Sequence, residues 1–337
     1  MYYRNIAINR NICRTVIRSG GTLTPLLIST EDSKGLGLMN PSILADNGEL
    51  LVNLRNVNYT LYHAEGRQLY NNRYGPLVYL HPEDDPYLRT TNYVLRLNKD
   101  FTVKEYFLLD TKKLDIEPVW EFVGLEDARL VRWDGKLYAC GVRRDVKPNG
   151  EGRMELSELR FRKHKLEEGD RSRIAPPKDQ NSYCEKNWMP ILDMPYHFVK
   201  WTNPTEVVKV NPLENASRTI YMSEKGIPDM PDLRGSSQVI PFGKDHRFCI
   251  VHDCDLFGNK MEQKDATYMH RWVVWDKEWN IVHVSDPWSF MDGEIEFCCG
   301  MCWWEDDLLV TFGFQDNAAY ILRIPKSLIN TIVQWKQ

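Results

Sequence analysis

The chain has 337 residues, which is enough for one large domain or two ordinary ones. Hydrophobic residues make up 42% of it and charged residues 27%, a balance that excludes an intrinsically disordered chain. The net charge of −4 gives no general attraction to nucleic acid or to an anionic membrane, so neither is expected as a partner. No apolar run has the length of a membrane span and the start is too polar for a signal peptide, so a cytoplasmic location is expected.

Short strands separated by turns are predicted along most of the chain. Residues 1–35 contain two apolar stretches, Cys13 to Ile17 and Leu23 to Ile28, with two glycines between them. Strand–turn–strand units then open at about residues 40, 124, 186, 236 and 297. In the second unit, Asp134-Gly135 predicts the turn of a hairpin, with one strand before the turn and the returning strand after it.

Helical periodicity is weak. The best helix candidates are Met154 to Lys165, which is interrupted, and Ser327 to Trp335. The charged, proline-bearing stretch Lys163 to Gln180 is predicted to be a solvated loop.

This pattern predicts an all-β fold. Five similar strand–turn–strand units favour a five-bladed β-propeller, in which strand ends distant in sequence meet around one axis. We expect a single catalytic domain over residues 1–337, with residues 1–35 closing or flanking the last blade. The oligomeric state is left open, and an oligomer is compatible with the sequence.

The cysteines do not predict a metal site. Cys299 and Cys302 form a CxxC, but the spacing of Cys249 and Cys254 does not match the second pair of a zinc site. The CxxC lies in a segment predicted to be a strand rather than at a helix start, so reduced, packed thiols are expected. The chain also has no glycine-rich phosphate loop and no dinucleotide fingerprint, so no cofactor is expected.

The segment from Gly124 to Arg129 carries the strongest chemical signal. Glu126 and Asp127 are adjacent acids, and in an extended chain their side chains are expected to point to opposite faces. Arg129 shares a face with Asp127 and is expected to hold or orient its carboxylate. From these residues alone, an ion pair at a strand edge remains an equal alternative.

Four motifs together resemble those of glycoside hydrolase family 130, the β-mannoside phosphorylases, and of the related β-mannosyltransferases. They are Asn40-Pro41-Ser42, Asn53-Leu54-Arg55, Gly124-Leu125-Glu126-Asp127-Ala128-Arg129 and Phe312-Gly313-Phe314-Gln315-Asp316. The resemblance runs from about residue 36 to residue 325. It implies a five-bladed propeller and an inverting enzyme that transfers a glycosyl group on a β-mannoside-like substrate.

The resemblance also implies roles for individual residues. Asp127 matches the general acid, which protonates the glycosidic oxygen while a nucleophile attacks the anomeric carbon from the opposite face. Substrate binding is implied for a further set of residues: Asn40, Ser42, Arg55, Glu126, Arg129 and Asp316. Trp188 and Trp201 are candidates for stacking on an acceptor sugar, and His252 and His270 for roles in or behind the site.

The partner of the sugar remains open between phosphate and a sugar nucleotide. Arg143, Arg144 and Lys186 are implied as phosphate-binding residues, and the same cations suit a diphosphate. At the position of the phosphorylases' histidine the sequence is Trp201-Thr202-Asn203-Pro204, and Ala128 replaces the usual proline.

Two further functions stay open. Hydrolysis requires a carboxylate base that activates water, for which Glu185, Glu294 and Glu296 are candidates without a spacing argument. A glycan-binding propeller without catalytic activity is the other alternative.

Overall fold

The computed structural model describes residues 11–62, 78–80, 84–178, 180, 182–258 and 264–335. These residues form the helices α1 (Ile12–Arg18), α2 (Thr30–Ser33) and α3 (Lys326–Val333), and the rest of the regular structure is β-strand. Within these ranges, none of the helices has the length and apolarity to cross a membrane. The all-β prediction is confirmed, and so is the C-terminal helix.

The first half of the chain forms one nine-stranded sheet. Its strand order is β2-β3-β6-β7-β12-β11-β10-β9, with β8 paired to β6. The two halves of this sheet join through a short parallel pairing of β7 with β12. The strands are β2 (Leu38–Asp46), β3 (Glu49–Val57), β6 (Leu88–Leu97), β7 (Val103–Asp110), β8 (Phe122–Val123), β9 (Glu126–Trp133), β10 (Lys136–Arg143), β11 (Arg153–Arg162) and β12 (Lys165–Arg173).

The second half of the chain forms three further sheets. One consists of β13 (Met189–Pro190), β14 (His197–Trp201), β15 (Glu206–Asn211) and β16 (Ala216–Met222). The next consists of β17 (Arg234–Gly235), β18 (Ile240–Phe242), β19 (His246–Gly258), β20 (Lys264–Asp276) and β21 (Ile281–Val284). In the last, β22 (Glu296–Trp304), β23 (Asp307–Phe314) and β24 (Ala318–Ile324) are completed by β1 (Thr22–Pro25), which pairs antiparallel with β24. A two-stranded ribbon of β4 (Thr60–Tyr62) and β5 (Val78–Leu80) stands apart from these.

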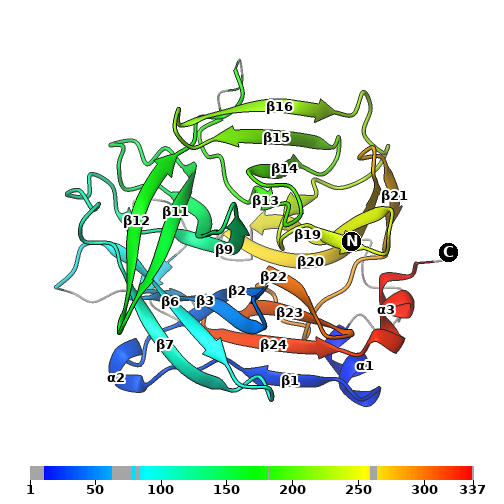
Figure 1. Ribbon diagram of the computed structural model, residues 1–337, viewed down its shortest axis with the longest axis horizontal. Helices are drawn as coiled ribbons and strands as arrows, with labels where there is room; N and C mark the ends of the chain where they lie inside the picture. Colours follow the sequence, from blue (N-terminus) through cyan, green and yellow to red (C-terminus); the bar gives the residue numbers. More distant parts are fainter. Residues whose placement is uncertain are drawn as a thin grey trace.

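The sheets are arranged around a common middle. In Figure 1, β2, β9 and β22 lie near the centre of the view, and the other strands of their sheets lie outward from them. Gln238, fully buried just before β18, holds these three strands together. Its amide nitrogen donates to the carbonyl oxygens of Ile43 (2.9 Å) and Leu130 (3.0 Å), and its amide oxygen accepts from the Met301 N–H at 2.9 Å.

The predicted strand–turn–strand units are confirmed as antiparallel pairs. They are β2–β3, β9–β10, β14–β15, β18–β19 and β22–β23. The cysteines of the CxxC lie in strand β22 and are free and buried, as expected.

Two predictions about the middle of the chain are wrong. Residues 154–162 belong to strand β11 instead of a helix, and residues 165–173 form strand β12 instead of a solvated loop. The charges that suggested a loop are neutralised inside the sheet. Glu155 on β11 accepts a hydrogen bond from Arg143 at 2.8 Å and one from Arg173 at 3.3 Å, and Arg171 pairs with Glu168 on the same strand.

Candidate functional site

A β-bulge at the start of β9 brings both acids of the Glu126-Asp127 pair to one side of the strand. Asp127 has a φ of +49°, and the β9–β10 register shifts between Cys140 and Val142. A residue in the left-handed region interrupts the alternation of side chains that an extended strand would show. Both carboxylates therefore contact the same guanidinium, that of Arg55, which corrects the expectation of opposite faces.

Gly141 makes room for this bulge. A Cβ atom at Gly141 would lie 2.4 Å from the Glu126 carbonyl oxygen and 3.2 Å from the Ala128 Cα. Both neighbours are backbone atoms, so the bulge requires glycine at this position of β10.

The Asp127 carboxylate is held by two donors from the neighbouring strands. The same oxygen, Oδ1, accepts from Asn40 Nδ2 on β2 and from Arg55 Nη1 on β3, each at 2.8 Å. Asn40 itself has a φ of +45° at a second bulge, where the β2–β3 register shifts between Met39 and Ser42. Motifs distant in sequence thus meet at one carboxylate.

Arg55 is buried and uses all three of its nitrogens. Nε donates to Thr90 Oγ1 at 3.1 Å, and Nη2 donates to the Tyr59 hydroxyl at 2.6 Å and to Glu126 Oε2 at 3.3 Å. Burial would lower the pKa of Arg55, but Tyr59, Asp127 and Glu126 together raise it, so the group stays charged. Tyr59 was not anticipated from the sequence, where only its spacing of four residues from Arg55 could have suggested it.

The environment shifts the pKa values of the two carboxyls in opposite directions. Burial raises the pKa of Glu126, and Asp127 adds to the rise, against the opposing effect of Arg55. Burial acts the same way on Asp127, but Arg55, then Arg129 and the Asn40 hydrogen bond, bring its pKa below the ordinary value. Within the described residues, Glu126 Oε1 is buried without a hydrogen-bond partner. Two neighbouring carboxyls whose pKa values are shifted in opposite directions are typical of acid–base pairs in enzymes.

Arg129 and Ser42 support the backbone around Asp127. Arg129, 1% exposed, donates from Nη1 to the Asp127 carbonyl oxygen at 2.7 Å and from Nε to the Ser236 carbonyl oxygen at 2.8 Å. Its contact is with the backbone of Asp127, which corrects the expectation that it holds the carboxylate. The buried Ser42 hydroxyl donates to the Ala128 carbonyl oxygen at 2.7 Å and accepts from the Leu130 N–H at 3.1 Å. Ser42 therefore has a structural task in the place of the expected sugar contact.

The three cations expected to bind phosphate are not equivalent. Arg143 is buried on the far face, with Nε on Glu155 at 2.8 Å and Nη1 at 3.4 Å from Asp145, so its charge is already neutralised. Arg144 points the other way, because successive residues of an extended segment face opposite sides. Arg144 and the exposed Lys186 both lie close enough to Glu126 to lower its pKa. Of the three cations expected to bind phosphate, Arg144 and Lys186 are the two near the carboxylates, and the inclusion of Arg143 is corrected.

Trp188 is also placed differently from the expectation. Its side chain is 1% exposed, packs edge-on against Phe198 and donates from Nε1 to Glu185 at 3.0 Å. It therefore offers no face to a sugar. Trp201 is 41% exposed and lines a recess of about 210 Å³ together with Lys186 and Arg234. Of the two tryptophans, Trp201 is the one that a sugar or a base could reach.

The remaining side of the site contains Asp316, Tyr268 and His252. Asp316 is within electrostatic reach of the carboxylate cluster, because its charge contributes to raising the pKa of Arg55. Burial raises the pKa of Tyr268, and Asp316 and Asp127 add to the rise. His252 Nδ1 and the Ser236 hydroxyl form a hydrogen bond of 2.8 Å, and the His252 ring stacks on Tyr268. Burial holds the pKa of His252 well below its usual value, so the ring is neutral. His270, by contrast, is fully buried against Trp288 and belongs to the core.

Of the three acids considered for hydrolysis, Glu296 and Glu185 are buried and already accept hydrogen bonds, and Glu294 is exposed. Glu296 is buried and accepts backbone N–H groups from Phe290, Met291 and Gly293. Glu185 is buried beneath Trp188 and also accepts from Ser182 at 2.9 Å. Over the described ranges, no group of three or more His, Cys, Asp and Glu side chains is placed to hold a metal ion.

Comparison with solved structures places the fold. No protein-family model matches the sequence, and no curated protein matches it. The β-1,2-mannobiose phosphorylase from Listeria innocua superimposes with a TM-score of 0.51 at 14% identity, over 89% of this chain and 92% of that one. The chain shares the fold of this phosphorylase.

Two further solved structures agree. A glycosyl hydrolase from Bacteroides ovatus gives a TM-score of 0.52 at 12% identity, over 87% of this chain and 85% of that one. A provisionally assigned glycoside hydrolase from Parabacteroides distasonis gives 0.54 at 11% identity, over 86% and 87%. At these identities the likeness establishes the fold alone, and at that level the expected resemblance to β-mannoside phosphorylases is confirmed.

Proposed function

We propose that the chain is a five-bladed β-propeller enzyme that transfers a glycosyl group, with inversion, on a β-mannoside-like substrate. The blades would be β2-β3-β6-β7, β9 to β12, β13 to β16, β17 to β21, and β22 to β24 with β1. The pairing of β1 with β24 supports the expectation that residues 1–35 flank the last blade of a single domain.

The observation that carries this proposal is the Asp127 carboxylate, held by Asn40 and Arg55 from two other strands at 2.8 Å each. A surface ion pair would need no such arrangement of bulges and buried donors. A carboxylate fixed in this way is suited to exchange a proton with a sugar oxygen, because general acid–base catalysis depends on position first.

Asp127 is proposed as the general acid/base. In the direction of bond cleavage, the C1–O bond breaks, the departing oxygen takes the proton of Asp127, directly or through a sugar hydroxyl, and the nucleophile forms the new bond at C1. In the direction of synthesis, the ionised Asp127 takes the proton of the acceptor hydroxyl while the phosphate or nucleotide leaves. The lowered pKa of Asp127 favours its ionised form at neutral pH, which is the form that this second direction uses.

Asp316, with Arg55 and Glu126, is proposed to contact the donor sugar. Asn40 is proposed to hold the catalytic carboxylate in place, and Arg129 to hold the backbone that carries it. Arg144 and Lys186 are proposed to bind the anionic partner, because both lie within electrostatic reach of Glu126 and neither contacts the carboxylates as Arg55 does. That partner is inorganic phosphate or the diphosphate of a sugar nucleotide, and both offer the oxygens that Arg and Lys bind.

A donor screen tests the proposal. The purified protein is incubated with mannose 1-phosphate, or with a series of sugar nucleotides, and a panel of acceptor sugars, and released phosphate or nucleotide is measured. Phosphate release from mannose 1-phosphate would identify a phosphorylase, and nucleotide release a glycosyltransferase. Arg144→Ala is expected to raise the KM for the donor at least tenfold, whereas Lys163→Ala, on an exposed turn, should leave it unchanged. No release from any donor would contradict glycosyl transfer and favour a glycan-binding propeller.

A further inference from the structure

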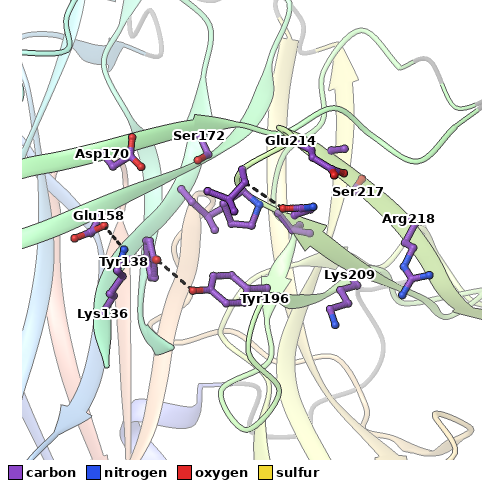
Figure 2. A pocket seen from close by; sticks show the side chains of 16 residues that line it. Lys136, Tyr138, Glu158, Asp170, Ser172, Tyr196, Lys209, Glu214, Ser217 and Arg218 are labelled. Carbon is purple, nitrogen blue, oxygen red and sulfur yellow. Dashed lines mark hydrogen bonds and ion pairs between the residues drawn. The ribbon is translucent and has the colours of Figure 1, made fainter. Parts of the chain in front are cut away.

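A large cavity lined by described residues lies away from the carboxylates. It has a volume of about 770 Å³ and opens between the sheet of β10, β11 and β12 and the sheet of β15 and β16 (Figure 2). Lys136 and Tyr138, which line it, belong to the turn end of the β9–β10 hairpin, whereas Glu126 pairs with Val142 at the opposite end. The cavity is therefore separate from the site proposed for catalysis.

One wall of the cavity is a face of the sheet of β10, β11 and β12, and the side chains on this face change from apolar to polar from one cross-strand row to the next. Tyr138, Glu158 and Asp170 form one cross-strand row, and Leu156 and Ser172 belong to the next row. Leu156 still packs in the apolar cluster between the two sheets, but the outer row presents a hydroxyl and two carboxylates. Facing sheets normally exclude water with apolar side chains, so a polar row here leaves an open recess.

The opposite wall comes from the β15–β16 hairpin. Lys209 and Arg218 are directly cross-strand from each other, and both line the cavity. Leu213, at the hairpin turn, is 94% exposed at the rim, where it offers an apolar surface. Tyr196 lies below, with its hydroxyl 3.3 Å from that of Tyr138 (Figure 2).

The lining carries no net charge. Three basic side chains, of Lys136, Lys209 and Arg218, are balanced by three acidic ones, of Glu158, Asp170 and Glu214. Lys136 and Glu158 pair at 3.0 Å, with the carboxylate buried and the lysine exposed. A charged ligand gains little from such a surface, whereas a neutral ligand with many hydroxyls finds both donors and acceptors.

We propose that this cavity is a second carbohydrate site, which binds a neutral oligosaccharide without acting on it. Its volume is in the range of about 300–1,000 Å³ that holds small-molecule ligands. Its mixture of charged groups, tyrosine hydroxyls and an apolar rim matches the alternation of hydroxyl edges and C–H faces on a sugar chain. Such a site would hold a glycan chain on the protein at a place distant from Asp127.

The probe is β-1,4-mannotriose, and its binding is measured by calorimetry without any donor, so the result does not depend on turnover. Ala216→Trp places a ring in the cavity from its own wall and is expected to weaken binding at least tenfold. Ile220→Trp, on the same strand but outside the cavity, is the matched control and should bind as the wild type does. Arg218→Ala, an exposed substitution that cannot overfill the site, should weaken binding severalfold.

Three results would overturn the proposal. They are equal affinity of Ala216→Trp and Ile220→Trp for mannotriose, no detectable binding to the wild type, and tighter binding of trigalacturonic acid than of the neutral trisaccharide. In the donor screen, Ala216→Trp is expected to turn over at the wild-type rate. A turnover defect in that variant would show that the cavity is not separate from the catalytic site.

Discussion

Arg55 is the side chain through which the two carboxyls of the candidate site influence each other. It reaches Asp127 at 2.8 Å and Glu126 at 3.3 Å while it is itself removed from water. One guanidinium cannot fully stabilise two buried negative charges, so one carboxyl ionises readily and the other retains its proton to higher pH. The hydrogen-bond geometry assigns the negative charge to Asp127, because its carboxylate also accepts a hydrogen bond from the Asn40 amide.

The raised pKa of Glu126 predicts a pH effect on stability. Because the folded state holds this proton more tightly than the unfolded chain, the contribution is complete below the ordinary glutamate pKa, about 4.3, and is lost as the pH rises through the folded value. Glu126→Gln has no proton to lose. Its urea midpoint is therefore expected to fall less than that of the wild type between pH 4 and pH 8.

The control for this prediction is Glu278→Gln, on an exposed turn. It should follow the wild-type curve throughout. Parallel curves for Glu126→Gln and the wild type would mean that Glu126 titrates normally in the folded chain.

The bulges of β2 and β9 are the elements that build the site. Asn40 and Asp127 both have positive φ, and each sits where the pairing with the next strand shifts. A regular strand would turn one of each pair of neighbouring side chains away from the middle of the molecule. The bulges instead turn Asn40 and both acids toward Arg55, and the proposed proton exchange depends on this placement of Asp127.

Gly141→Ala tests the β9 bulge. The added Cβ would lie 2.4 Å from the Glu126 carbonyl oxygen, so the bulge must shift and displace Asp127. We expect activity on the donor found in the screen to fall at least 10²-fold, since a misplacement of about 1 Å can have that effect.

Gly135→Ala, in the turn of the same hairpin, is the control. Its φ is +77° and no atom lies within 4 Å of an added Cβ. It should lower stability by about 1 kcal/mol and leave activity intact. Equal activity of the two variants would show that the bulge does not position Asp127.

The same elements show what the sequence could predict. Alternating apolar residues around turns such as Asp134-Gly135 are local signals, and the strand pairs that they predict are present. The bulges are not local signals, because the left-handed conformation of Asp127 goes with contacts to Asn40 and Arg55 on other strands and with the space left by Gly141 on β10. The same reason explains Trp188, whose ring is buried by Phe198 on a strand that folds back over it.

The pattern of charges led to a wrong prediction for strand β12 for a related reason. Residues 163–180 look like a solvated loop because the sequence does not show that a charge such as that of Arg173 has its partner, Glu155, on a neighbouring strand. Arg143 and Arg144 are likewise indistinguishable in the sequence, and the register of β10 decides which one lies near Glu126.

At the scale of the whole molecule, Gln238 fastens the innermost strands to one another. Its amide bonds to β2, β9 and β22, which come from widely separated parts of the chain. The two strands that carry Asn40 and Asp127 are among them, so the middle of the fold and the candidate site depend on the same side chain.

Gln238→Leu should test this dependence. It would leave two carbonyl oxygens and one N–H buried without partners, and each such group costs about 1–3 kcal/mol. We expect the free energy of unfolding to fall by at least about 3 kcal/mol, measured by urea denaturation. A loss below about 1 kcal/mol would mean that the strands are held by their apolar packing alone.

The role of Asp127 as general acid/base is decided by comparing the turnover rate of Asp127→Asn on the best donor with that of Asp134→Asn. Asp134 is exposed in the hairpin turn of the same strand pair, and asparagine suits its φ of +49°. We predict that Asp127→Asn loses about 10²–10⁴-fold in kcat, the usual contribution of a general acid or base, while Asp134→Asn keeps the wild-type rate. Wild-type turnover by Asp127→Asn would contradict the account, because the carboxylate at the middle of the fold would then have no part in the chemistry.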